Sequence, residues 1–205
     1  MKQESITIRE KETAAKIQNT HINAVRTKDI TKKGVRVFAD GNIGISGAIG
    51  DVAEEKLVEN AVQNLSVGIE YPYPISRDRK DHRSYNDNPM TAGELLSVTE
   101  SILETLRKEY PDFEFSETIS ANEIMTEMRN SEGLDLKYED AHYSLGLILK
   151  EKKSANLFDG ILMCVGCRFD MDKFWAFNRP YLEAYRNRVA LPEGEVLPVF
   201  TMEPD

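Results

Sequence analysis

The sequence has few of the side chains that bind metals or act as nucleophiles, with only three histidines and two cysteines in 205 residues. None of His21, His82 and His142 is followed by glutamate or by a second histidine four residues later, so the helical motif of many zinc hydrolases is missing. A Ser/His/Asp grouping, a Walker phosphate loop and a dinucleotide-binding glycine turn are missing as well. We therefore predict no catalytic residue and no metal ligand in this chain.

Long apolar runs and an excess of positive charge are also absent. No run approaches the roughly 20 residues that cross a bilayer, and the polar start MKQESITIREKE lacks the apolar centre of a signal peptide. The chain carries 26 lysine and arginine residues against 35 aspartate and glutamate residues, a formal charge of -9. That balance argues against a general electrostatic grip on nucleic acid. We expect a cytoplasmic protein with no membrane or nucleic-acid partner.

The two cysteines lie close together, as Cys164-Val165-Gly166-Cys167. Such a pair can be a redox site or half of a zinc site, and both uses require the two sulfurs to converge. The surrounding segment, Leu157–Phe169, reads as a strand, in which residues three apart point to opposite faces. No second cysteine or histidine pair completes four zinc ligands. We expect two unlinked, reduced cysteines.

One stretch combines a hairpin signal with an amphipathic helix. Two β-type runs, Val35–Ala39 and Ile43–Ala48, flank Asp40-Gly41, and an Asp-Gly pair between apolar runs is typical of a hairpin turn. Asp51 and Glu54 then resemble a capping box, after which apolar residues recur at helical spacing. We expect a hairpin followed by a helix that packs on it, with the glycines nearby serving turns and bulges.

The remaining segments predict further strands and helices. Ser5–Thr13 alternates as a first strand, and Ala14–Val25 gives a second, less clear one. Thr91 and Glu94 form a better capping box, for a helix that ends before Pro111. The buried stripe of that helix is predicted to be Leu95, Thr99, Ile102, Leu103 and Leu106. A long strand from Phe113 with a bulge near Asn122 follows, and then returning strands at Leu136–Leu149 and Leu157–Phe169. The last predicted element is a helical region that is capped by Asp170 and continues from Asn178 and Pro180 to about Val189. The predicted fold class is α+β, a twisted, mostly antiparallel sheet covered on one face by two or three helices.

The segment Gly68–Pro89 contains three prolines and a dense cluster of charge, so it reads as a connector without regular structure. It also holds the one basic spot in an acidic chain, formed by Arg77, Arg79, Lys80, His82 and Arg83. Two interpretations stay open, a solvated loop and a site that attracts acidic peptides or a phosphate.

Three motifs resemble the N-terminal domain of the TldD/PmbA family. The first is the run Gly34–Val37 with Asp40-Gly41 and the acidic start of the next helix, preceded by an opening strand with Arg9 in the matching order. The second is the turn Asn130–Gly133, Asn-Ser-Glu-Gly, which is either a loop near bound peptide or a hairpin tip that needs Asn and Gly for backbone reasons. The third is Gly194–Phe200, which resembles the opening of the family's C-terminal domain.

The resemblance divides the chain into an N-terminal domain at residues 1–190 and, at 191–205, a connector with the first strand of a C-terminal domain. Members of the family were named as modulators of DNA gyrase and are understood as metallopeptidases. The resemblance implies a cytoplasmic dimer whose N-terminal domains help enclose a chamber that admits unfolded peptides. Cleavage would take place at a divalent metal, expected to be zinc, which a His-Glu-x-x-x-His helix and a later cysteine hold in the C-terminal domain.

By this resemblance the chain is the non-catalytic part of a hydrolase and is inactive alone. Its peptide-contacting residues are not singled out by the sequence. Two alternatives stay open: a standalone non-catalytic module for peptide binding or dimerisation, and a catalytically silent partner subunit of the same family. The sequence also leaves open whether the dimer is formed by like or unlike chains.

Overall fold

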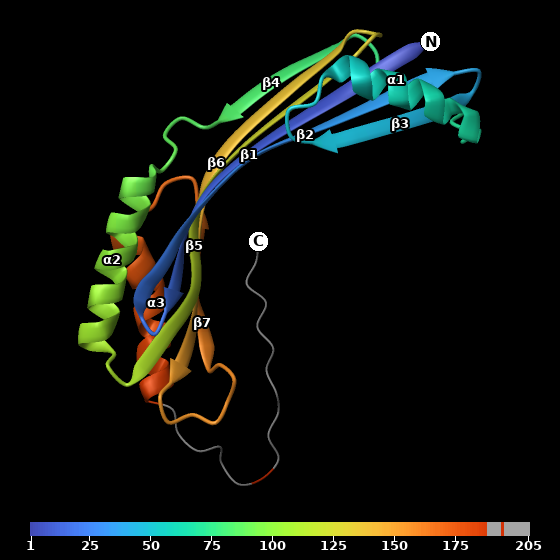
Figure 1. Cartoon of the computed structure of the whole chain (residues 1–205). Coiled ribbons are helices and arrows are strands. Elements are labelled where there is room, and N and C mark those ends of the chain that lie inside the picture. Colours follow the sequence, from blue (N-terminus) through green and yellow to red (C-terminus); the bar gives the residue numbers. More distant parts are fainter. Residues whose placement is uncertain (188–193, 195–205) are drawn as a thin grey trace. The chain divides into compact units, whose positions relative to one another are not determined.

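The computed structural model describes residues 1–187 and 194, and the chain divides into two units, 1–169 and 170–205. The first unit is built on one sheet of seven strands in its described part (Figure 1). The elements of this unit are β1 (Lys2–Gln18), β2 (His21–Ala39), β3 (Asn42–Ile49), α1 (Glu54–Asn64), the 3-10 turn η1 (Leu65–Val67), β4 (Arg79–Tyr85), α2 (Ala92–Glu109), β5 (Phe113–Asn130), β6 (Leu134–Glu151) and β7 (Gly160–Gly166).

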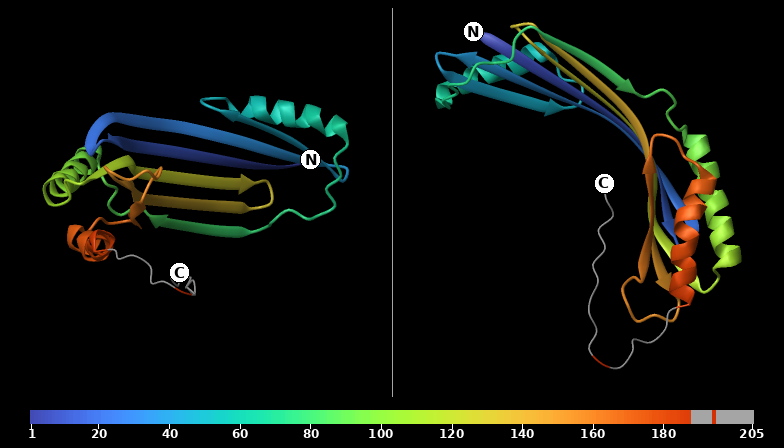
Figure 2. Two further views of the ribbon diagram at one scale, coloured as in Figure 1. Left: turned by 90° about the horizontal axis from the view of Figure 1, so that it is seen from below. Right: turned by 180° about the vertical axis from the view of Figure 1, so that it is seen from behind.

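The strands follow the order β3-β2-β1-β5-β6-β4, and β7 pairs with the second half of β6 (Figure 2). All pairs are antiparallel except β4 with β6. The predicted fold class, an α+β fold with a twisted and mostly antiparallel sheet, is confirmed. None of the described helices is both long enough and apolar enough to cross a membrane.

The first hairpin is longer than predicted. Asn19 and Thr20, with φ of 51° and 60°, form its turn, so the prediction of a second strand at Ala14–Val25 is wrong because that range crosses the turn. Its strands hold few apolar residues and are joined by ion pairs between neighbouring strands. Glu10 bonds Lys28 and Lys32 at 2.7 and 2.6 Å, which lowers the pKa of Glu10 to about 2. Because charged residues occupy these strand positions, apolar and polar residues do not alternate regularly here, and the sequence signal for a strand is weak.

The second hairpin is confirmed, with Asp40 and Gly41 at φ of 49° and 76°. Helix α1 packs on it through a small core of Val35, Val37, Leu57 and Ala61. Gly44 is neither a turn nor a bulge residue, because it pairs with Val37 in a ladder without a register shift. A Cβ at this position would lie 1.9 Å from the carbonyl oxygen of Ala61. Its missing side chain lets the helix lie directly on the strand.

The two predicted capping boxes had different outcomes. Helix α2 begins as expected, since Thr91 Oγ1 accepts from the Glu94 amide and the Glu94 carboxylate accepts from the Thr91 amide. The buried residues of α2 are the predicted Leu95, Thr99, Ile102, Leu103 and Leu106. For α1 the prediction is wrong: its N-cap is Ala53, with no side-chain cap. Asp51 instead lies 3.5 Å from Lys33 Nζ on the neighbouring strand.

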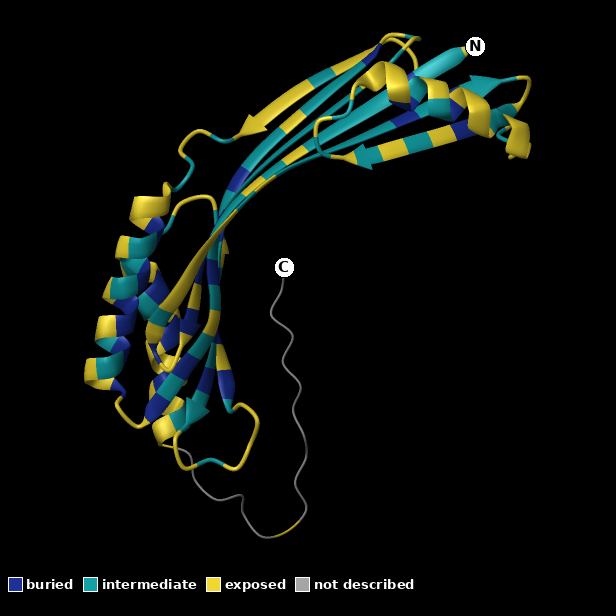
Figure 3. Cartoon of the chain, in the orientation of Figure 1, coloured by how far each residue is buried: buried dark blue, intermediate teal, exposed yellow. Residues whose placement is uncertain are grey.

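The strand register places α1 and α2 on one face of the sheet. Val35, which lies under α1, pairs with Ser5 of β1. Ala15 lies an even number of residues along the same strand and pairs with Ile119, and both are buried in the part of the sheet that α2 contacts. Figure 3 shows buried residues along α2 and the strands beside it. Because alternate residues share a face, both helices cover the same side. We call it the helix face and the other side the open face.

Two further predictions are wrong. The pairing of β5 with β1 and β6 runs without a register shift past Asn122, so β5 has no bulge there. Ile124 and Met128 simply point to the open face. The connector Gly68–Pro89 contains a strand, β4, which pairs in parallel with Leu134–Asp140 of β6. Its charged side chains gave no apolar period, and its hydrogen bonds come from a partner far away in sequence.

In the second unit, α3 (Met171–Arg186) begins as predicted, with Asp170 Oδ1 accepting from the Lys173 amide at 3.0 Å. Pro180 lies inside this helix rather than starting a new one. The predicted connector and strand at 191–205 fall outside the described residues, Gly194 excepted.

Candidate functional site

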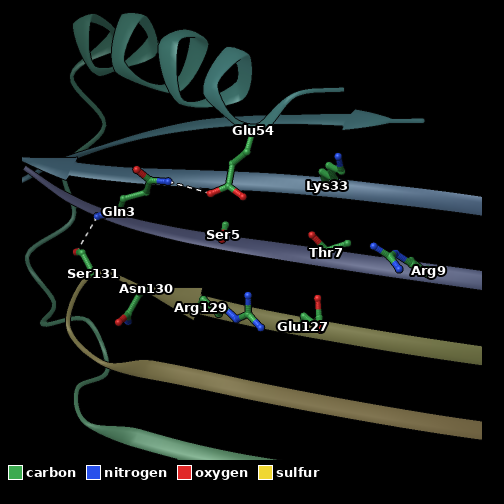
Figure 4. Close-up of a pocket in the computed structure, with 10 residues that line it drawn as sticks. All are labelled: Gln3, Ser5, Thr7, Arg9, Lys33, Glu54, Glu127, Arg129, Asn130 and Ser131. Carbon is green, nitrogen blue, oxygen red and sulfur yellow. Dashed lines mark hydrogen bonds between the residues drawn. The ribbon is translucent and has the colours of Figure 1, made fainter. Parts of the chain in front are cut away.

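A groove of about 530 Å³ lies on the helix face, between the first turn of α1 and strands β1 and β5. We call it the α1 groove (Figure 4). Its lining consists of Gln3, Ser5, Thr7, Arg9, Lys33, Glu54, Glu127, Arg129, Asn130 and Ser131. It brings together the opening strand, the start of α1 and the Asn-Ser-Glu-Gly turn, all of which the resemblance had pointed to in the sequence.

Strand alternation explains why the groove is polar. Ser5, Thr7 and Arg9 project from one face of β1, and across the ladder Ser5 pairs with Arg129 and Thr7 with Glu127. Ile6 and Ile8, which lie between these residues on the same strand, point to the open face instead. Between the two helices the helix face is therefore hydrophilic, and a ligand there would meet hydroxyl, amide and charged groups.

Hydrogen bonds close one end of the α1 groove. The backbone amide of Gln3 donates to Ser131 Oγ at 3.1 Å, and the backbone amide of Ser131 donates to the backbone carbonyl of Gln3 at 2.9 Å. The Gln3 side chain donates to Glu54 Oε1 at 3.1 Å. The hairpin tip, the first strand and the start of α1 thus hold one another in place.

Asn130 stabilises the hairpin tip itself. Its Oδ1 accepts from the amides of Glu132 and Leu134 at 2.9 and 3.0 Å, and its Nδ2 donates to the Ser76 carbonyl at 2.9 Å. Gly133 has a φ of 89°, a conformation that favours glycine. The backbone interpretation of this turn therefore accounts for its Asn and Gly, and the turn also forms one end of the groove.

The cations of the groove differ in how far they are engaged. Lys33 Nζ donates to the Val52 carbonyl at 2.8 Å, and Arg129 Nε lies 3.4 Å from Asp135 Oδ1. The Arg9 side chain is exposed and makes no ion pair or hydrogen bond within residues 1–187. No histidine or cysteine lines the groove, so its chemistry is hydrogen bonding and charge pairing.

The basic cluster of the sequence is split by the strand that contains it. Lys80 and His82 point to the helix face, where both approach Asp135, at 3.7 and 3.2 Å. The hydrogen bond from His82 lowers the pKa of Asp135. Arg77, just before the strand, lies 3.2 Å from Glu132. These basic side chains are paired with nearby carboxylates rather than gathered into an anion site.

The other two cations of β4, Arg79 and Arg83, point to the open face. Arg83 bonds both carboxylate oxygens of Asp81, at 3.1 and 2.8 Å, and thereby lowers the pKa of that carboxyl. The Arg79 side chain makes no ion pair or hydrogen bond in the described part of the chain, although its charge helps to lower the pKa of Asp81. The interpretation of the basic cluster as an anion site therefore applies only to Arg79, because the other members of the cluster are paired with carboxylates.

The histidines and cysteines have ordinary local partners. His21 Nδ1 lies 3.3 Å from Arg107, and His142 Nδ1 lies 2.8 Å from Asp140. Cys164 Sγ lies 3.1 Å from the Tyr143 hydroxyl, Cys167 is exposed, and both cysteines are free. Within residues 1–187 and 194, no three His, Cys, Asp or Glu side chains are grouped as metal ligands. The described residues therefore do not fit the metal that the resemblance implies.

No protein-family model matches the sequence, and no curated protein matches it. Solved structures do share its fold, and they define a class whose members are named TldE or candidate modulators of DNA gyrase. TldE from Thermococcus kodakarensis matches 90% of this chain with a TM-score of 0.68 and 13% identity. The candidate gyrase modulators of Thermotoga maritima and Bacteroides thetaiotaomicron match 80% and 91% of it, with TM-scores of 0.60 and 0.68 and identities of 15% and 9%.

The matched region is 44%, 38% and 45% of those three chains, so this chain spans less than half of their length. At such low identities the shared property is the fold. The resemblance predicted from short motifs is thus confirmed at the level of fold.

Proposed function

We propose that this chain is the non-catalytic N-terminal domain of a TldD/PmbA-like metallopeptidase that acts on unfolded peptides in the cytoplasm. The observation that carries the proposal is the fold, shared over 80–91% of this chain with structures named TldE or candidate gyrase modulator. Parts of two of the motifs that suggested the family line the α1 groove: the opening strand with Arg9 and the acidic start of α1, and the Asn-Ser-Glu-Gly turn. The metal, expected to be zinc, belongs in this proposal to a C-terminal domain, because the described residues hold no ligand set for it.

In the proposed protein the domain helps enclose the chamber of a homodimer or heterodimer and contacts the peptide that enters. The α1 groove supports this role, since hydroxyl, amide and charged groups along a strand suit the main chain of an extended peptide. Two alternatives remain: a standalone binding or dimerisation module with this fold, and a silent partner subunit. The standalone module would use the α1 groove without any peptidase domain. The silent partner subunit would have the C-terminal domain but no metal site in it.

Reading the source gene in frame past the codon for Asp205 tests the proposal. A further frame of roughly 200–250 codons, the size of an ordinary domain, containing His-Glu-x-x-x-His supports the metallopeptidase. The same extension without that motif supports the silent partner. A stop codon directly after Asp205 overturns the peptidase and leaves the standalone module.

A further inference from the structure

The open face of the sheet is apolar where the helix face is polar. Ile6, Met128 and Leu136 lie side by side on β1, β5 and β6, because Ile6 pairs with Met128 and Met128 with Leu136. All three are only partly buried. The register continues to Asp81 on β4, the edge strand beside them. An apolar strip across the strands therefore ends at a charged edge.

A pocket of about 340 Å³ lies at this junction, and we call it the β4 pocket. Met128, Leu136 and Thr126 line it on the central strands. Tyr138 lines it as well, with its ring 5.8 Å from that of Tyr85 on the edge strand. The volume is at the lower end of the range for small-molecule sites, and it exceeds what one aliphatic side chain fills.

The charges at the β4 pocket favour an anion. The charged lining residues whose side chains point to the open face are Arg79, Arg83 and Asp81, two cations against one carboxylate, in a chain of net charge -9. Lys137 also lines the pocket, but its side chain points to the helix face, where it pairs with Glu139 at 2.8 Å. Arg83 is paired with Asp81. Arg79 is exposed on the edge strand, and its side chain has no ion-pair partner in the described part of the chain. It is therefore available to a ligand.

We propose that the β4 pocket binds the C-terminal residue of an unfolded peptide, with an aliphatic side chain over Met128 and Leu136 and the terminal carboxylate on Arg79. This inference rests on the proposed peptide-handling function and adds a second peptide contact, for the C-terminal end of a peptide, on the face opposite the α1 groove. An apolar body with one adjacent anionic group matches an apolar lining with one available guanidinium, which pairs well with carboxylates. A peptide N-terminus, being cationic, would be repelled by the same cations.

A neighbouring cavity supplies room for the residues before the C-terminus. It has about the same volume, 340 Å³, and its lining shares Met128 with the β4 pocket and includes Ile6, Gly34 and Ile45. Gly34 leaves space beside Ile6, whose Cγ2 would lie 3.1 Å from a Cβ at position 34. The two cavities follow one another across the strands, so an extended peptide could run from one into the other.

The test uses the whole chain and fluorescein-labelled peptides in an anisotropy titration. One short flexible peptide ends in Ala-Leu with a free carboxylate, a second is its C-terminal amide, and a third ends in Ala-Gly as the free acid. The free acid ending in leucine should bind at least about tenfold more tightly than the acid ending in glycine, because a buried side chain contributes that much. It should bind about twofold to fivefold more tightly than the amide, because a pair with an exposed arginine contributes less. Raising the salt concentration should weaken the acid and leave the amide nearly unchanged.

Arg79→Gln should remove most of the preference for the acid over the amide. Arg26→Gln is the matched control, since Arg26 is also an exposed strand arginine but lies near the turn of the first hairpin, away from both the β4 pocket and the α1 groove, and it should keep the preference. Equal binding of acid and amide, equal effects of the two variants, or no binding of the acid would overturn the proposal. A stop codon after Asp205 would remove the peptidase and leave this preference intact, so the two proposals fail separately.

Discussion

Replacing Gly44 by alanine tests whether close contact between α1 and β3 holds that end of the sheet together. The added Cβ would lie 1.9 Å from the Ala61 carbonyl oxygen and 3.0 Å from the Leu65 amide nitrogen. Contacts below 3.0 Å are not tolerated, so the helix must move outward by roughly 1 Å or more, and a gap of that size forfeits a quarter to a half of each dispersion contact. Both atoms belong to the backbone, so no rotamer change relieves the clash.

The expected loss is about 2–4 kcal/mol in the free energy of unfolding. Overpacking costs about 1–3 kcal/mol and occasionally more, and a rigid backbone neighbour places this site at the upper end. The lower backbone entropy of alanine in the unfolded chain returns about 0.5–1 kcal/mol. The core of Val35, Val37, Leu57 and Ala61 depends on the same approach, so its contacts loosen together.

Urea denaturation measures the loss, and amide hydrogen exchange locates it. Gly146→Ala is the matched control, because it makes the same change within a strand where no atom lies within 4 Å of the added Cβ. It should leave stability unchanged or raise it slightly. Exchange should accelerate in α1 and stay slow in α2, since each helix packs on a different part of the sheet. A Gly44→Ala protein as stable as Gly146→Ala would refute the reasoning.

Three further changes test other parts of the first unit. Thr91→Ala removes the N-cap of α2 and should cost about 1 kcal/mol, read from the urea midpoint. Thr105→Ala, a partly buried position of the same helix whose hydroxyl donates only to the Ser101 carbonyl of that helix, should cost much less; equal losses would contradict the capping role. Hydrogen bonds from Lys28 and then Lys32 lower the pKa of Glu10 in the folded protein to about 2, against an ordinary 4.5. The contribution of Glu10 to stability is therefore complete above about pH 4.5 and is lost as the pH falls towards 2. Glu10→Gln should be less stable than the wild-type protein at pH 6 and equally stable near pH 2, and a constant difference across that range would exclude the mechanism. Gly133→Ala should cost about 1–3 kcal/mol, since φ is 89° and the Cβ would lie 2.9 Å from Asp78 Oδ1; Gly93→Ala, with nothing within 4 Å in a helix, should instead raise the urea midpoint.

The sequence predicted well wherever local chemistry decides the structure. The Asp40-Gly41 turn, the Thr91 and Glu94 capping box and the buried stripe of α2 depend on residues a few positions apart. Hydrophobic spacing predicted the fold class for the same reason, since it sets which face of each element is buried.

The predictions failed where distant partners decide. Strand β4 has no apolar period, and its hydrogen bonds come from β6, more than fifty residues later. The change of apolar parity near Asn122 was interpreted as a bulge, yet it marks where the apolar side of the sheet changes from the helix face to the open face. The basic cluster looked like one site, and pairing in β4 sends its members to opposite faces.

By itself the sequence determined the Asp40-Gly41 turn, the caps of α2 and α3, the buried stripe of α2 and the resemblance in fold, because each depends on the order of neighbouring residues. Only the tertiary structure decided that Gly44 admits a helix, that Gln3, Glu54 and Ser131 close one groove, and that Arg79 stands beside an apolar pocket without an ion-pair partner within the described residues. Strand register and helix packing bring those groups together, and the energies that set them come from contacts between residues that are far apart in the chain.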